Sequence, residues 1–441
     1  MPQNAYHFPP GFLWGTATAA HQVEGNNTNN NWYAWENTEG KILRGDKSGL
    51  ACDWWGGRWK EDLDRAAAAG QNSHRFSVEW SRVQPAYDHW DEHALDVYRE
   101  MAKGMVEHGM KPMVTLHHFT DPLWLMAQGG WENDETPEKF AAFTGKVVEA
   151  LKDFVNLWVT INEPNGYVTN GYVFGVFPPG KHDQIAAYKV MRNVLRGHAA
   201  AYQTIHQRQP EARVGVAHSY RPFRVARKWF PPDWWQRIFV DWNYNQVFPM
   251  ALQRGKLEFL YQSVKMPEIK HTQDFMGVNY YSVDEIMFAL KPAQLFLDRR
   301  FPRGSEVSET GFVANIPAGL FDTLNWARQF GLPIIITENG VEGNGDELRQ
   351  RYILEHIFQT WRAVNLGWPV EGFYYWTLVD NFEWDRGWTQ CFGLWGLTPN
   401  TQERHWRPSV DVYQAVCQEN GISRETVAKY APELLPKLFT K

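Results

Sequence analysis

The sequence lacks the features of an exported or membrane-spanning protein. Its first residues, MPQNAYHFPP, contain neither a basic segment nor an apolar run, and no apolar run elsewhere is long enough to cross a bilayer. Three cysteines, Cys52, Cys391 and Cys417, are odd in number, widely spaced and in no metal-binding pattern, which favours reduced thiols. We therefore expect a cytoplasmic protein.

The chain also lacks a strong excess of charge. It has 44 basic and 50 acidic residues in 441, a net charge of −6, and no block of like charge. Such a balance argues against nucleic acid or an anionic membrane as the main partner, and it leaves small neutral molecules as the expected ligands. The oligomeric state stays open.

Motifs for metals and cofactors are scarce. The adjacent His117 and His118 invite a metal interpretation, but no third ligand stands at a suitable spacing. Neighbouring residues of a strand point to opposite faces, so only one of the two histidines can line a pocket. The dinucleotide fingerprint GxGxxG does not follow the first expected strand. We expect no metal and no cofactor.

Aromatic residues, in contrast, are abundant, at 15% of the chain with 23 tryptophans. Their rings can stack on the faces of sugars, but they also fill large cores. Only the aromatic residues at loop tips therefore bear on a sugar site.

Two stretches each place a glutamate at the end of an expected strand. The stretch 157–165, LWVTINEPN, is apolar and β-branched until Asn162 and Glu163, and Pro164 then ends the strand. The run 333–340, PIIITENG, reads as a parallel strand buried on both faces and ends in Glu338. Either glutamate alone could end a strand in solvent, but the pair suggests acid and base chemistry.

Eight strand candidates alternate with helical segments along the chain. They span residues 12–18, 73–79, 111–119, 157–165, 213–218, 274–281, 333–340 and 370–378. This alternation predicts an α/β fold, a single (β/α)8 barrel domain over residues 1–441 with extended βα loops. An open doubly wound sheet is the alternative fold.

Polar side chains gather at the carboxyl ends of these strands, where barrel enzymes keep their active sites. They are Gln22, Arg75, His118, Asn162, Glu163, Asn279, Tyr281, Glu338 and Trp376. Two carboxylates, an arginine, a tyrosine and several amides match glycoside hydrolysis better than other reaction classes.

Motifs along nearly the whole chain also resemble those of one family. FLWGTATAAHQVEG, RFSVEWSR, VTLHHF, TINEPN, GVNYY, ITENG and WTLVDNFEW are similar, in this order, to motifs of the family 1 glycoside hydrolases, the β-glucosidase and β-galactosidase family. The resemblance implies a retaining β-glycosidase, of the β-glucosidase type and with β-galactosidase or β-fucosidase activity as well, that acts on small β-glycosides or oligosaccharides.

The resemblance also implies a role for individual residues. Glu163 matches the general acid/base, and Glu338 matches the nucleophile that forms a covalent glycosyl-enzyme. The residues implied to support the nucleophile are Arg75, Tyr281 and Asn279. Those implied to bind the sugar are Gln22, His118, Asn162, Trp376, Glu383, Trp384 and Phe392.

Some positions depart from the family pattern. Phe119 stands where the family usually has tryptophan, the stretch GLWGLTPNTQERHW after Phe392 is unusual, and the loop TGFVANIPAG leaves Phe312 as a weak candidate for the aglycone platform. Three alternatives stay open: a barrel without activity, a 6-phospho-β-glycosidase, and an enzyme that favours transglycosylation over hydrolysis. The preferred sugar and the natural aglycone are not determined by these motifs.

Overall fold

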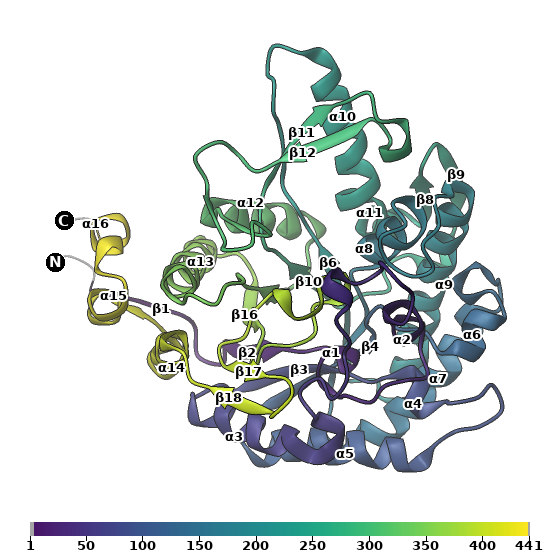
Figure 1. Ribbon diagram of the computed structural model, residues 1–441, viewed down its shortest axis with the longest axis horizontal. Coiled ribbons are helices and arrows are strands. Elements are labelled where there is room, and N and C mark those ends of the chain that lie inside the picture. The colour runs from purple at the N-terminus through teal and green to yellow at the C-terminus, as the bar shows by residue number, and fades with distance from the viewer. Residues whose placement is uncertain (1–3, 440–441) are drawn as a thin grey trace.

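The computed structural model describes residues 4–439, and a closed barrel of parallel strands lies at its centre (Figure 1). The order around the barrel is β10, β15, β16, β2, β3, β4, β5 and β6. These strands are β2 (Leu13–Ala17), β3 (Ser73–Ser77), β4 (Lys111–His117), β5 (Leu157–Asn162), β6 (Arg213–Ser219), β10 (Phe275–Asn279), β15 (Ile334–Asn339) and β16 (Val370–Trp376). The predicted (β/α)8 barrel is confirmed, and the open sheet is excluded because β10 pairs with both β15 and β6.

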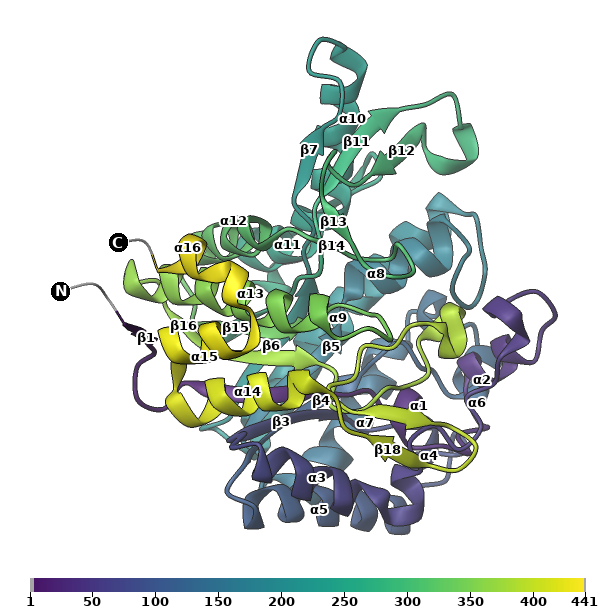
Figure 2. The same cartoon turned by 60° about the vertical axis from the view of Figure 1, so that its left-hand side comes forward.

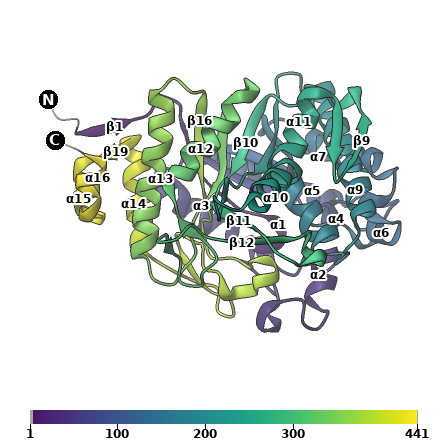
Figure 3. The same cartoon turned by 90° about the horizontal axis from the view of Figure 1, so that it is seen from above.

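Helices surround the barrel and shield the outer faces of its strands (Figures 1 and 3). They are α3 (Trp59–Ala68), α5 (Glu92–Glu107), α7 (Thr136–Leu151), α9 (Gln184–Arg208), α11 (Val247–Arg254), α12 (Pro317–Ala327), α13 (Glu347–Asn365) and α14 (Pro408–Glu419). The strands are buried on both faces, as the continuous apolar runs predicted; every residue of β5 and of β15 is buried. Among residues 4–439, no helix is both long and apolar enough to cross a bilayer.

Short helices occupy the loops at the carboxyl ends of the strands. They are α1 (Ala20–Val23), α2 (Asn31–Glu36), α4 (Trp80–Val83), α6 (Leu123–Ala127) and α8 (Pro164–Val168). In barrel enzymes the loops at this end surround the active site, on a base that the strands hold rigid.

Two further loops build a protrusion that stands out from the barrel (Figure 2). It consists of β7 (Phe223–Val225), α10 (Pro231–Asp241), β11 (Asp284–Phe288) and β12 (Leu297–Arg300), with β11 between β7 and β12. Two proline-bearing stretches of this protrusion, 228–235 and 291–309, could be taken for loops, but each contains a regular element. Prolines are tolerated in the first turn of a helix, so α10 begins at Pro231, and β12 lies within the second loop.

The two ends of the described chain lie side by side (Figure 1). β1 (Ala5–His7) pairs antiparallel with β19 (Gly421–Ser423), and α15 (Arg424–Tyr430) and α16 (Leu435–Leu438) follow. This pairing joins segments more than 400 positions apart, as Tyr6 beside Ile422 illustrates. No pattern in the sequence indicates this pairing, because strands of three residues are too short to show a hydrophobic period.

Candidate active site

The backbone at Glu163 turns the chain out of β5 and directs the carboxyl group into the site. β5 ends at Asn162, Glu163 has a φ of 45° in the left-handed region, and α8 begins at Pro164. Phe119 and Trp384, also at this end of the barrel, share a positive φ. Residues other than glycine adopt this conformation at a cost of about 1–3 kcal/mol and cluster at functional sites.

Glu338 lies on β15 with its carboxyl group bonded on both oxygens. Arg75 Nη1 donates to Oε1 over 2.8 Å and the Tyr281 hydroxyl donates to Oε2 over 2.7 Å. Arg75 is fully buried and Glu338 nearly so. Arg75 lies on β3, and its charge has a partner in Glu338, as a buried charge requires.

Arg75 also fixes the neighbouring groups. Its Nη2 donates to Asn162 Oδ1 over 2.7 Å, its Nε donates to Thr115 Oγ1 over 3.0 Å, and its Nη1 also reaches the carbonyl of Thr337. One side chain on β3 therefore connects β4, β5 and β15 across the barrel interior.

Asn279 connects the surroundings of Glu163 with those of Glu338. Its Nδ2 donates to Glu163 Oε1 over 3.0 Å and to Asn162 Oδ1 over 3.1 Å, while its Oδ1 accepts from Thr337 Oγ1. Thr337 directly precedes Glu338 on β15. The amide thus couples the position of Glu163 to the strand that carries Glu338.

The two carboxyl groups differ in their electrostatic surroundings. Burial and the nearby charge of Glu338 raise the pKa of Glu163 to about 7, against hydrogen bonds from Asn279 and Ser219. Burial also raises the pKa of Glu338, but Arg75 and Tyr281 oppose that rise. We expected these two partners to favour the ionised form of Glu338, and each acts in that direction, although burial outweighs them. Glu163, in contrast, has no ion pair among residues 4–439.

A histidine and two tryptophans form one side of the site. The ring of His118 lies 5.9 Å from those of Trp376 and Trp384 and is nearly parallel to both. Its Nε2 is 3.0 Å from Asn162 Nδ2, and burial lowers the pKa of His118 well below its usual value. The neutral ring accepts from Asn162, so Nδ1 carries the proton and is available as a donor.

The prediction that His117 and His118 point to opposite faces is confirmed. His117 bonds Asp121 through Nε2 and packs against Trp131, away from the site. His118 alone faces Asn162.

Gln22 and Glu383 lie next to these tryptophans, since Glu383 directly precedes Trp384 and is hydrogen-bonded to Trp376. Gln22 Nε2 donates to Glu383 Oε2 over 3.0 Å, to Asn381 Oδ1 and to the carbonyl of Phe382. Burial raises the pKa of Glu383 to about 8, and the charges of Glu338 and Asp385 act in the same direction. Buried atoms without a protein partner among residues 4–439 gather here, namely Gln22 Oε1, His118 Nδ1 and Asn381 Nδ2. Such groups suit a ligand rich in hydroxyls.

Phe392 closes the site beside Tyr281. Their ring centroids are 5.9 Å apart, and Phe312 lies 6.3 Å from Phe392 on the outer side. Phe119, which departs from the family pattern, packs edge-on against Trp384 at 5.2 Å. The predicted residues therefore lie at one end of the barrel, linked by hydrogen bonds or ring contacts; their individual roles remain predictions.

Sequence reasoning missed several residues of this site. Asn381 stands within the DNFEW motif, yet only Glu383 and Trp384 were selected from it. Ser219, the last residue of β6, lies at a strand tip one position beyond the predicted strand and bonds the Tyr244 hydroxyl over 3.0 Å. Its polar character at that place was the available signal. Nothing in the sequence indicated Tyr244, which reaches the site from a separate helical turn (Trp242–Gln246).

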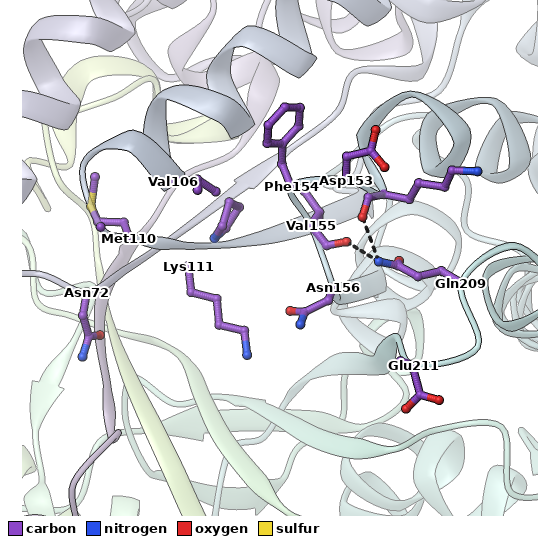
Figure 4. Close-up of a pocket in the computed structure, with 13 residues that line it drawn as sticks. Asn72, Val106, Met110, Lys111, Asp153, Phe154, Val155, Asn156, Gln209 and Glu211 are labelled. Atoms are coloured by element: carbon purple, nitrogen blue, oxygen red, sulfur yellow. Dashed lines mark hydrogen bonds between the residues drawn. The ribbon is translucent and has the colours of Figure 1, made fainter.

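A different hollow opens at the amino ends of the barrel strands (Figure 4). It is lined by residues at the start of β4 and before β5 and β6, among them Lys111, Asp153 and Asn156, and Gln209 Nε2 donates to the carbonyls of Lys152 and Val155. None of the predicted site residues lines it. This end of a barrel contributes to stability rather than to chemistry.

Comparisons with known proteins agree with the geometry. The family model described as Glycosyl hydrolase family 1 matches residues 4–422. Beta-glucosidase A of Thermotoga maritima is 31% identical over 95% of this chain and 99% of its own length. A beta-galactosidase of Sulfolobus acidocaldarius is 28% identical over 95% of this chain and 96% of its own. Among solved structures, a beta-glycosidase from Pyrococcus horikoshii superposes with a TM-score of 0.90 at 33% identity, covering 98% of both chains.

Proposed function

This chain belongs to glycosyl hydrolase family 1, and we propose that it is a retaining β-glycosidase with Glu338 as nucleophile and Glu163 as general acid/base. The main observation in support of the proposal is that the carboxyl groups of two buried glutamates are contacted by different groups. Glu338 receives a cation and a phenol hydroxyl, whereas the pKa of Glu163 is raised to about 7. Two carboxyl groups whose surroundings affect their pKa values differently are suited to different roles in the reaction, one as acid and one as nucleophile.

The proposed reaction has two steps. In the first, a carboxylate oxygen of Glu338 attacks the anomeric carbon, the glycosidic C–O bond breaks, and Glu163 gives its proton to the departing oxygen. In the second, Glu163 takes a proton from water, the water oxygen attacks the same carbon, and the ester bond to Glu338 breaks. Two inversions leave the product with the β configuration.

The remaining side chains position the sugar in this proposal. Asn162 is held by Arg75 and Asn279, which suits a contact to the 2-hydroxyl that strengthens in the transition state. His118, Gln22 and Glu383 offer hydrogen-bonding groups for the remaining hydroxyls, and Trp376 offers a platform for the ring. The relatives include a beta-glucosidase and a beta-galactosidase, and we propose glucosides as the first substrates to test.

The pH dependence of the rate follows from the raised pKa of Glu163. The acid form of Glu163 is present below about pH 7 and is lost as the pH rises through that value. We expect kcat/KM for a β-glucoside with a poor, alcohol leaving group, which needs protonation, to fall by about tenfold per pH unit above this point. Glu163→Gln should abolish this fall and leave a low kcat/KM that does not change with pH in this range.

The matched control for this measurement is Glu355→Gln, which changes another buried glutamate, on α13 and bonded to Asn315 and Lys437. This variant should keep the fall of kcat/KM above about pH 7. If the same fall persists unchanged in Glu163→Gln, a group other than Glu163 is responsible for it.

The two roles can be separated by rescue with azide. Glu338→Gly should abolish hydrolysis, and added azide should restore turnover as an α-glycosyl azide, because the anion enters from the vacated face. Glu163→Ala should instead give a β-glycosyl azide and should lose about 10²- to 10⁴-fold only with poor leaving groups, which need protonation. The anomeric configuration is read by NMR, and a β product from Glu338→Gly would reverse the assignment.

The site favours neutral sugars over their 6-phosphates, because the wall that faces the 4- and 6-hydroxyls carries the carboxyl group of Glu383. An ionised Glu383 would repel a phosphate by several kcal/mol at low effective dielectric, and a protonated one would supply no positive charge. No positive charge is added by the residues that follow at 389–391, which are Thr389, Gln390 and Cys391. We expect kcat/KM for nitrophenyl β-glucoside to exceed that for its 6-phosphate.

Glu383→Ser should lower kcat/KM for the neutral substrate by about a hundredfold, since two hydrogen bonds to a buried group are lost. Asp385→Ser, a change two residues away, should have a much smaller effect. Equal or better turnover of the 6-phosphate by the unmodified protein would contradict this interpretation of the wall.

A further inference from the structure

The protrusion exposes large apolar side chains in an unusual concentration. Trp229 and Trp235 are 79% and 74% exposed, and Trp234 and Ile238 are also exposed. Tyr261, 86% exposed in the turn between two short strands, Lys256–Phe259 and Gln262–Lys265, stacks on Phe239 of α10 with ring centroids 5.4 Å apart. We call the set Trp229, Trp234, Trp235, Ile238 and Tyr261 the aromatic face.

The orientation of α10 is fixed by its opposite side. Asp233 is buried, accepts from the backbone of Phe288 and pairs with Arg227. Gln236 donates to the carbonyl of Leu295 in the β11–β12 hairpin. Because these two residues hold α10 to the hairpin, Trp234, Trp235 and Ile238 point to solvent. The helix α10 stands at the outer end of the protrusion (Figures 1 and 2); Trp234 and Trp235 lie on it and Trp229 just precedes it.

The charge of the protrusion is opposite in sign to that of the whole chain. Residues 221–241 and 284–303 contain nine basic and five acidic residues, whereas the chain carries a net charge of −6. Lys228, directly beside Trp229, is exposed, as is Arg303. Neither has an ion pair among residues 4–439. The net negative charge of the whole chain therefore conceals a local positive region.

Three kinds of occupant could cover exposed tryptophans. A second copy of the chain in a twofold dimer would bring this positive region against itself, which is unfavourable. A neutral polysaccharide would use the ring faces but neither Ile238 nor the positive charge. An anionic lipid surface uses all three, because tryptophan and tyrosine prefer the interface of a bilayer and basic residues are attracted to acidic headgroups.

We propose that the aromatic face docks this protein peripherally on an anionic lipid bilayer. No membrane-spanning helix is needed for such binding, which depends on buried apolar area and on charge. The loops that build the protrusion follow β6 and β10, so the aromatic face lies at the same end of the barrel as the two glutamates.

Sedimentation with lipid vesicles tests the proposal on the full chain. We expect binding to vesicles of phosphatidylcholine mixed with phosphatidylglycerol, weak binding to phosphatidylcholine alone, and loss of binding at high salt. Trp229→Ser combined with Trp235→Ser should lower the partition coefficient by about tenfold or more. Lys228→Gln should lower it by about fivefold.

Trp406→Ser is the matched control, since Trp406 is 53% exposed but lies between β18 (Glu403–His405) and α14. It should bind vesicles as the unmodified protein does, and thermal unfolding should confirm that all variants are folded. Absence of binding to both vesicle types would overturn the proposal. So would a dimer that the tryptophan changes dissociate, or binding to β-glucan without binding to vesicles.

Discussion

The buried charge of Arg75 is the constraint on which the candidate site depends. A guanidinium group in the barrel interior is tolerated only with partners, and here Glu338, Asn162, Thr115 and the carbonyl of Thr337 supply them. These partners come from three other strands of the barrel. The requirement to satisfy one cation therefore fixes the position of Glu338 and, through Asn162 and Asn279, the surroundings of Glu163.

The same network explains how two similar residues can do different chemistry. Both glutamates are buried and both have a raised pKa, so burial alone does not distinguish them. The difference is that Glu338 accepts from Arg75 and Tyr281, whereas Glu163 accepts from the neutral amide of Asn279. A carboxylate beside a cation is suited to attack, and a carboxyl group without one is suited to carry a proton.

Much of this arrangement could be predicted from the sequence because it follows from local rules. Apolar runs of strand length, such as the one before Glu338, predicted buried parallel strands, and the carboxyl ends of such strands meet at one end of a barrel. Contacts over long sequence distances could not be predicted in this way. The β1–β19 pairing, the Tyr244 hydroxyl beside Ser219, and the bond from Gln236 to Leu295 that orients α10 all depend on tertiary packing. The positive charge of the protrusion could not be predicted either, because the net charge of the whole chain is negative.

The central claim is that Glu338 forms a covalent bond to the sugar, and trapping that species tests it most directly. A 2-deoxy-2-fluoro-β-glucosyl fluoride combines an electron-withdrawing fluorine at C2, which slows both steps, with a good leaving group, which restores the first. Incubation should add one fluorosugar to the intact protein, and peptide mass mapping should locate it on Glu338. A label on Glu163, or an unlabelled protein that releases the product with inverted configuration, would contradict the account.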